Sequence, residues 1–210
     1  MNQLNYSPDN ILSAPVNLVL VLSGPSGVGK DATLSALKTR STSPVHIITN
    51  TTRSQRLGET DGEHYHFISQ PEFTRMISNN ELLEHAEVYG NYYGVPKAAV
   101  HQALAHGKDV IIKVDVQGAI TIKKNLPDAV LIFLMPPSLD ELSRRLRKRG
   151  TESSSDLELR LNTARSEIEQ LSSFDYVVVS HSNRIESTTD DISAIIAAEK
   201  LRIPSRSYNL

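Results

Sequence analysis

A glycine-rich segment near the start of the chain has the residue types that bind phosphate. Its residues are Gly24, Pro25, Ser26, Gly27, Val28, Gly29, Lys30 and Asp31. It follows the phosphate-loop spacing G-x-x-x-x-G-K-[ST] except at its last position. Glycines let backbone N–H groups curl around phosphate oxygens, the following helix start adds partial positive charge, and the Lys30 ammonium neutralises the outer phosphates. We therefore expect a binding site for a nucleotide polyphosphate.

Asp31 stands where a phosphate loop normally carries the serine or threonine hydroxyl that binds Mg²⁺. A carboxylate is also an oxygen ligand for Mg²⁺, so Asp31 can replace the hydroxyl or hold a metal-bound water. Its negative charge beside a polyphosphate should weaken nucleotide binding without Mg²⁺. The alternative is that Asp31 only caps the N-terminus of the following helix.

A second segment combines arginines with hydroxyl and aromatic side chains. Arg53 and Arg56 follow two threonines, and two arginines at this spacing can hold a phosphate through bidentate hydrogen bonds. Farther along, Glu84 follows an apolar residue, and its carboxylate can accept two N–H bonds from a purine edge. These residues offer contacts for a phosphate group and for a purine base.

Apolar runs of strand length alternate with amphipathic patterns of helix length. We expect strands at 16–22, 45–48, 83–89, 110–114, 129–134 and 175–179, and helices at 31–40, 69–79, 97–106, 139–149, 156–171 and 188–202. Ser138 and Asp156 are the expected N-caps of two of these helices. Strands separated by helices predict an α/β fold with a parallel sheet core and helices on both faces. Residues 50–95 break the alternation and resemble a small inserted substructure.

The composition excludes several classes of protein. The chain has 210 residues, a formal net charge of −2 and no cysteine, which excludes a disulfide scaffold, a thiolate metal site and a cysteine nucleophile. The near-neutral charge argues against a protein whose whole surface binds nucleic acid. No stretch approaches the ~20 apolar residues of a membrane helix, and residues 1–15 carry no targeting signal. We therefore expect a cytoplasmic protein that binds neither nucleic acid nor a membrane.

Taken together, these motifs resemble guanylate kinase over residues 17–200. The matching pieces lie at 23–30, 51–53, 58–59, 65–67, 91–94, 114–118, 137–142 and 149–152. Several such pieces in this order are specific, whereas the phosphate loop alone indicates only nucleotide binding. The resemblance implies a P-loop nucleoside monophosphate kinase fold. It also implies Mg²⁺-dependent transfer of the γ-phosphoryl group of ATP to GMP, and to dGMP, by direct in-line displacement.

The resemblance also implies roles for single residues. The GMP site would consist of Thr49, Arg53, Arg56, Tyr65, Glu84, Tyr93 and Asp115. Glu84 would accept hydrogen bonds from guanine N1–H and the exocyclic amine, a donor pair that adenine lacks. The catalytic cations would be Lys30, Arg53, Arg149 and Arg160. Asp115 would lie near Mg²⁺, and Arg149 would also contact ATP. Asp31 is the second expected carboxylate for Mg²⁺, on its own chemistry rather than on the resemblance.

The same resemblance implies a division of the chain. Residues 1–15 would form an N-terminal arm, 16–48 and 97–202 the P-loop core, 49–96 the GMP-binding subdomain, 149–160 a lid, and 203–210 a C-terminal tail. Three further departures from the family's pattern stand beside Asp31, one of them a pair of residues. Val95 and Pro96 replace small hydroxyl residues, Lys113 replaces an acidic residue, and Ser180 replaces an asparagine.

Two alternatives to this function remain open. One is a non-catalytic interaction module of the same fold, which would typically lack the intact phosphate loop or the lid arginines that this chain keeps. The other is a related P-loop kinase that phosphorylates a different acceptor, such as a ribose bisphosphate. The acceptor segment at 49–65 together with Glu84 favours GMP.

Overall fold

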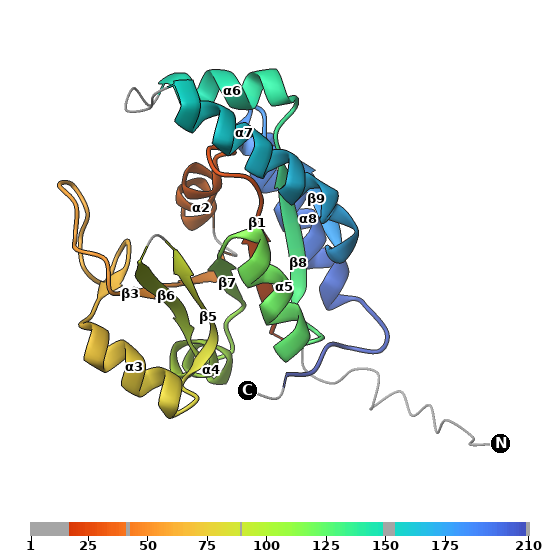
Figure 1. Cartoon of the computed structure of the whole chain (residues 1–210). Helices are drawn as coiled ribbons and strands as arrows, with labels where there is room; N and C mark the ends of the chain where they lie inside the picture. Colours follow the sequence, from red (N-terminus) through yellow and green to blue (C-terminus); the bar gives the residue numbers. More distant parts are fainter. Residues whose placement is uncertain (1–16, 41–42, 89, 149–153, 209–210) are drawn as a thin grey trace.

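The structure is a computed structural model that describes residues 17–40, 43–88, 90–148 and 154–208 (Figure 1). The expected N-terminal arm, Arg149 and the first part of the expected lid lie outside these residues. Within the described part of the chain, no helix is long and apolar enough to cross a membrane.

A five-stranded parallel sheet forms the centre of the molecule. Its strand order is β2-β7-β1-β8-β9, and every neighbouring pair is parallel. The strands are β1 (Val19–Ser23), β2 (Val45–Ile47), β7 (Val110–Lys113), β8 (Val130–Met135) and β9 (Tyr176–Val179). β1 lies in the middle and is buried along its whole length, which explains its continuous apolar run.

Helices cover both faces of this sheet, as the alternating pattern predicts. Alternate residues of β1 enter two separate cores, Leu20 on one face and Val21 on the other. The first core is closed by α2 (Lys30–Lys38) and α8 (Ile185–Lys200). The second is closed by α4 (Lys97–Ala105) and α5 (Val116–Asn125). The predicted elements of the core differ from these bounds by up to three residues.

Helix α5 is not among the elements predicted from the sequence. Its N-cap is Asp115, whose Oδ1 accepts a hydrogen bond from the Gly118 N–H at 2.7 Å. Val116, Ala119 and Ile122 bury one face of the helix. The prediction fails here because β-branched residues and an interior glycine give the segment low intrinsic helix propensity, and packing against the sheet overrides that preference.

The inserted substructure is a second, four-stranded sheet with one helix, on the left in Figure 1. Its strand order is β4-β3-β6-β5. The elements are β3 (Asn50–Thr51), β4 (His66–Phe67), α3 (Gln70–Ser78), β5 (Leu82–Val88) and β6 (Asn91–Pro96). The sequence pattern predicts α3 and β5 but not the other three strands. In the structure, Ser69 Oγ caps α3 by accepting a hydrogen bond from the Glu72 N–H. Two of those are only two residues long, too short to show a strand period.

Two helices pack against each other beside the phosphate loop. These are α6 (Leu139–Lys148) and α7 (Ser154–Glu169), joined through Leu142, Leu146 and Ala164. The predicted cap of α6 is confirmed, because Ser138 Oγ accepts a hydrogen bond from the Glu141 N–H at 3.1 Å. The predicted cap of α7 is wrong, because the helix begins at Ser154 and places Asp156 inside its first turn. A short 3₁₀ helix, η1 (Leu171–Ser173), follows α7.

Candidate active site

The phosphate loop connects β1 to α2 at the carboxyl edge of the parallel sheet, where α/β proteins bind their ligands. Gly24 has a φ of +135°, and a Cβ atom there would lie 2.2 Å from the Leu134 carbonyl oxygen. Only glycine therefore fits the first position of the loop. The N-cap of α2 is Gly29, which has no side chain to make a cap hydrogen bond. Asp31 lies in the first helical turn, so the alternative that it serves only as the helix cap is wrong.

Lys30 is folded back along the loop. Its ammonium donates to the carbonyl oxygens of Gly24 at 2.5 Å and Pro25 at 3.2 Å. Burial lowers the Lys30 pKa to about 8, and the nearby carboxylates of Glu167 and Asp31 oppose that shift. The side chain is thus a desolvated cation held against the loop, and bound phosphate would stabilise its charged form.

Asp31 and Lys113, two of the four departures from the family's pattern, are bonded to each other. The Lys113 ammonium donates to Asp31 Oδ1 at 2.7 Å. The lysine side chain is 17% exposed and the aspartate side chain 75%. The extra negative charge on the phosphate loop is therefore paired with an extra positive charge at the end of β7.

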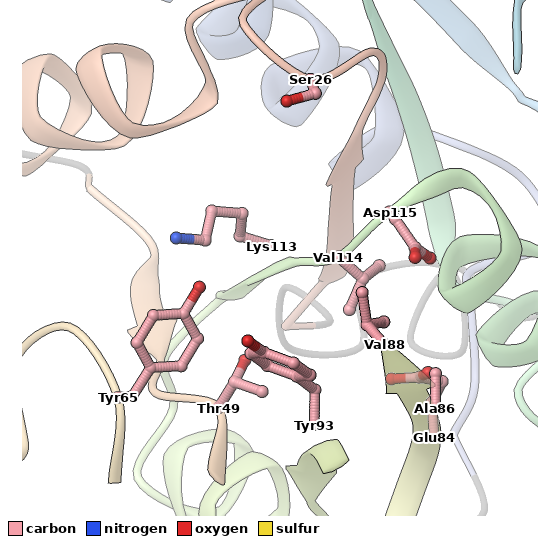
Figure 2. Close-up of a pocket in the computed structure, with 10 residues that line it drawn as sticks. All are labelled: Ser26, Thr49, Tyr65, Glu84, Ala86, Val88, Tyr93, Lys113, Val114 and Asp115. Carbon is pink, nitrogen blue, oxygen red and sulfur yellow. The ribbon is translucent and has the colours of Figure 1, made fainter. Parts of the chain in front are cut away.

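A pocket of about 360 Å³ lies between the phosphate loop and the second sheet (Figure 2). Its volume falls within the range of small-molecule sites. Five residues of the predicted GMP site line it: Thr49, Tyr65, Glu84, Tyr93 and Asp115. The phosphate loop contributes Ser26 to the same pocket, and β7 contributes Lys113. One cavity thus brings together the two segments that the sequence predicts to bind phosphate.

Arg53 lies beside this pocket and is held by Glu59. Its two terminal nitrogens donate to the two oxygens of the Glu59 carboxylate, at 2.8 and 3.0 Å. Its guanidinium lies 5.4 Å from the centroid of the Tyr65 ring. Hydrogen bonds with Glu59 first, and with Tyr93, raise the pKa of Arg53. Arg56 is exposed, and its backbone N–H donates to the same Glu59 carboxylate at 2.8 Å.

Glu84 is buried deep in the pocket, on β5. Burial and then the charge of Asp115 raise the pKa of Glu84 to about 7. Helix α5 approaches closely because it carries Gly118 there. A Cβ atom on Gly118 would lie 3.2 Å from Glu84 Cδ. A buried carboxyl group poised near neutral pH is suited to accepting hydrogen bonds from a ligand that brings its own N–H donors.

The chain matches the family model for guanylate kinase over residues 17–199. The chain belongs to the guanylate kinase family. It is 46% identical to the guanylate kinase of Desulfitobacterium hafniense over 191 residues, which cover 91% of this chain and 94% of that protein. It is 40% identical to the rice protein "Guanylate kinase 2, chloroplastic/mitochondrial", covering 98% of this chain and 72% of that one. The crystal structure of guanylate kinase from Anaplasma phagocytophilum superimposes with a TM-score of 0.72 at 36% identity, covering 92% and 91% of the two chains.

Membership of the guanylate kinase family makes the chain a nucleoside monophosphate kinase, a class of phosphotransferase. The P-loop fold expected from the sequence is the observed one. Arg149 lies outside the described residues, and Arg160 is half-buried on α7. The roles of Arg149 and Arg160 as catalytic cations of the lid therefore stay predictions.

Three residues beside the guanylate kinase site gain a role only from the structure: Glu59, Lys113 and Arg145. Glu59 belongs to the segment 58–59, which matches the guanylate kinase pattern, but the sequence does not show that it binds Arg53. Lys113 is visible in the sequence as a charge inside an apolar run. Arg145 is hidden among the other basic residues of α6, yet it donates to the Val28 carbonyl of the phosphate loop at 2.8 Å.

Proposed function

We propose that this chain transfers the γ-phosphoryl group of ATP to GMP, and to dGMP, giving ADP and GDP. The observation that carries the proposal is the single pocket that joins phosphate-loop Ser26 to the buried carboxyl group of Glu84. Four more of its residues, Thr49, Tyr65, Tyr93 and Asp115, are ones that the family resemblance assigns to the acceptor. A purine monophosphate in this pocket would lie with its base at Glu84 and its phosphate toward the loop.

The donor nucleotide would bind through the phosphate loop. The backbone N–H groups of residues 26–29 and the start of α2 would surround the outer phosphates, with Lys30 as their counter-charge. The buried Lys30 ammonium supports this assignment, because burial keeps its charge unscreened by water. Arg149 and Arg160 would close over ATP from the lid.

The acceptor phosphate would bind at the end of the pocket that carries hydroxyls and cations. Tyr65 and Tyr93 have their ring centroids 5.8 Å apart, and Arg53 lies over the Tyr65 ring. We assign Arg53, Arg56, Tyr65 and Tyr93 to the GMP phosphate and Thr49 to the wall beside it. Glu84 would accept the two guanine N–H groups as a carboxylate, and the adjacent Asp115 would add negative charge facing the same base.

Mg²⁺ is the expected cofactor, and it would neutralise charge on the phosphates as the phosphoryl group moves. Carboxylate, phosphate and water oxygens are its preferred ligands. Among the described residues, no three acidic or histidine side chains gather to hold a metal. The two carboxylates expected for Mg²⁺ from the sequence, Asp31 and Asp115, have the oxygen donors that suit an ion arriving on the nucleotide. We assign Asp115 to it first, because Asp31 Oδ1 already receives the Lys113 ammonium.

The transfer itself would be a direct in-line displacement. An oxygen of the GMP phosphate forms the new bond to the γ-phosphorus while the bond from that phosphorus to the ADP oxygen breaks. The acceptor phosphate is largely a dianion at neutral pH, because its second pKa is about 6. The reaction therefore needs no general base, and catalysis depends on positioning, charge neutralisation and exclusion of water.

A coupled assay of ADP release tests this function. The full-length chain is mixed with ATP, Mg²⁺ and one acceptor at a time: GMP, dGMP, AMP or UMP. We expect rapid ADP release with GMP and dGMP and only slow release with AMP and UMP. No release with any of the four would favour the non-catalytic module, and faster release with an added sugar phosphate would favour the other P-loop kinase.

A further inference from the structure

Lys113 ends strand β7 and points into the pocket between the phosphate loop and the acceptor residues. The three strand residues before it are buried in the sheet, so Lys113 is the point at which β7 enters the site. Figure 2 shows its side chain extending across the pocket toward Tyr65. The Lys113 ammonium lies 5.4 Å from the centroid of the Tyr65 ring. This is the carboxyl end of a central strand, the position from which α/β sheets contact their ligands.

The Tyr65 ring therefore has two cations beside it. The Arg53 guanidinium also lies 5.4 Å from the ring centroid. Tyr93, whose ring makes an edge contact with Tyr65, lines the same end of the pocket. Two cations and two phenol groups around one small volume fit the oxygens of a phosphate dianion, because each oxygen can then receive a charged or hydroxyl donor.

Lys113 also faces the phosphate loop. Burial lowers the pKa of Lys30, and the positive charge of Lys113 adds to that shift. Cations that repel each other in a partly desolvated site are stabilised by a polyanion that binds between them. Lys113 thus contacts Asp31 at the end of the phosphate loop and the Tyr65 ring, beside which Arg53 also lies.

Asp31 sets the position of the Lys113 ammonium. The ion pair is 2.7 Å long, with the carboxylate on the solvent side and the lysine side chain largely buried. A lysine has four rotatable bonds, and a fixed partner confines its ammonium to one region of the pocket. The loop residue that would elsewhere carry a metal-binding hydroxyl is here bonded to a cation of the acceptor pocket.

We propose that Lys113 contacts the acceptor phosphate and is a further catalytic residue, and that Asp31 is a positioning residue for it rather than a ligand of Mg²⁺. The proposal rests on the proposed function, since it names the phosphate of GMP as the group contacted. The lysine adds a positive charge between the two phosphates that must approach each other. Asp31 acts through Lys113 and touches neither substrate.

Binding calorimetry without ATP or Mg²⁺ tests the lysine directly. GMP and guanosine are titrated into the wild-type protein and the variants Lys113→Gln and Lys113→Arg. We expect Lys113→Gln to weaken GMP binding about tenfold, as loss of one charge-assisted contact does, and to leave guanosine binding unchanged. Lys113→Arg should keep most of the GMP affinity. Equal GMP affinities for wild type and Lys113→Gln would overturn the proposal.

The double variant Asp31→Asn/Lys113→Gln separates a phosphate contact from simple charge compensation. If Lys113 served only to neutralise Asp31, removing both charges would restore the wild-type affinity for GMP, and that result would overturn the contact. We expect the double variant to remain as weak as Lys113→Gln alone.

The single variant Asp31→Asn tests the positioning role in a steady-state assay. We expect a rise in KM for GMP of about threefold and an unchanged Mg²⁺ concentration at half-maximal activity. A shift of that Mg²⁺ midpoint in Asp31→Asn but not in Lys113→Gln would make Asp31 a metal ligand instead. If the proposed function is wrong, the wild-type protein will not bind GMP. If only the role of Lys113 is wrong, the wild-type protein will bind GMP and Lys113→Gln will bind it equally well.

Discussion

Glu59 holds both terminal nitrogens of Arg53, with Nη2–Oε1 at 2.8 Å and Nη1–Oε2 at 3.0 Å. The same carboxylate accepts the backbone N–H of Arg56 at 2.8 Å. Glu59 therefore fixes the loop after β3 and the direction of the Arg53 guanidinium at once. An arginine oriented in advance loses less side-chain entropy when it binds a phosphate.

Arg53→Ala should raise KM for GMP at least tenfold, because it removes the cation that we assign to the acceptor phosphate. Initial rates at varied GMP and saturating ATP measure the effect. KM for ATP should change much less, because the phosphate loop is left intact. Unchanged GMP kinetics would contradict the assignment.

Glu59→Gln should raise KM for GMP about threefold, since the amide keeps one hydrogen bond to Arg53 and loses the charge. In an Arg53→Ala background the same change should have little further effect, because Glu59 acts mainly through the arginine and the glutamine amide oxygen can still accept the Arg56 N–H. Glu63→Gln, an exposed change in the same loop, is the matched control and should leave KM unaltered. Additive effects of Glu59→Gln and Arg53→Ala would refute the coupling.

Glu84→Gln should abolish most of the preference for GMP over AMP. A buried site built to accept two N–H bonds rejects a base that lacks them by large factors, so we expect the ratio of kcat/KM values to fall about 100-fold or more. Glu87→Gln changes an exposed carboxylate on the same strand and should preserve the ratio. Retained preference in Glu84→Gln would remove Glu84 as the residue that reads guanine.

The raised pKa of Glu84 makes guanine binding depend on pH. Only the carboxylate can accept both guanine donors, so binding requires loss of the proton that Glu84 holds below its pKa of about 7. Affinity should therefore be high above this pKa and fall as the pH drops through it, by about tenfold between pH 8 and pH 6.

Guanosine is the ligand for this measurement, because it carries no phosphate group that titrates in the same range. Calorimetry at several pH values between 6 and 8 gives the profile, together with release of a proton on binding near pH 7. Glu84→Gln should bind guanosine weakly and equally at every pH. A flat profile for the wild-type protein would show that another group sets the affinity.

The parts of the site that the sequence predicts are those encoded locally. The phosphate loop consists of consecutive residues whose spacing alone determines its shape, and β1 is a continuous apolar run because both of its faces are buried. Glu84 and Tyr93 could be assigned to one site through the family's motif order, and both line the same pocket.

The parts that the sequence does not predict depend on partners far apart in the chain. Asp31 and Lys113 are 82 residues apart, and Arg145 and Val28 are 117 apart. Strand order and helix packing bring these pairs together, and a single sequence carries no direct signal of that arrangement. The sequence shows that Asp31 and Lys113 each depart from the guanylate kinase pattern. Their ion pair follows only from the parallel pairing of β7 with β1.

Arg145 connects helix α6 to the phosphate loop. Its guanidinium donates to the carbonyl oxygens of Val28 at 2.8 Å and Ser180 at 2.7 Å, and to Glu141 Oε1 at 2.9 Å. The side chain is 15% exposed. Since Val28 lies inside the loop, this arginine holds the loop against the helix that leads toward the expected lid.

Arg145→Ala should lower the free energy of unfolding by about 2–3 kcal/mol, because it leaves buried carbonyl groups without their charged donor. It should also raise KM for ATP more than KM for GMP, because the loop that it holds is assigned to the donor nucleotide. Arg144→Ala, one residue earlier on α6, removes a side chain that is 65% exposed and also pairs with Glu141. Arg144→Ala should lower the free energy of unfolding by no more than about 0.5 kcal/mol and leave KM for ATP and KM for GMP unchanged. Urea unfolding gives the stability of the two variants, and initial-rate kinetics give their KM values. An equal loss of stability in both variants would contradict a specific role for Arg145.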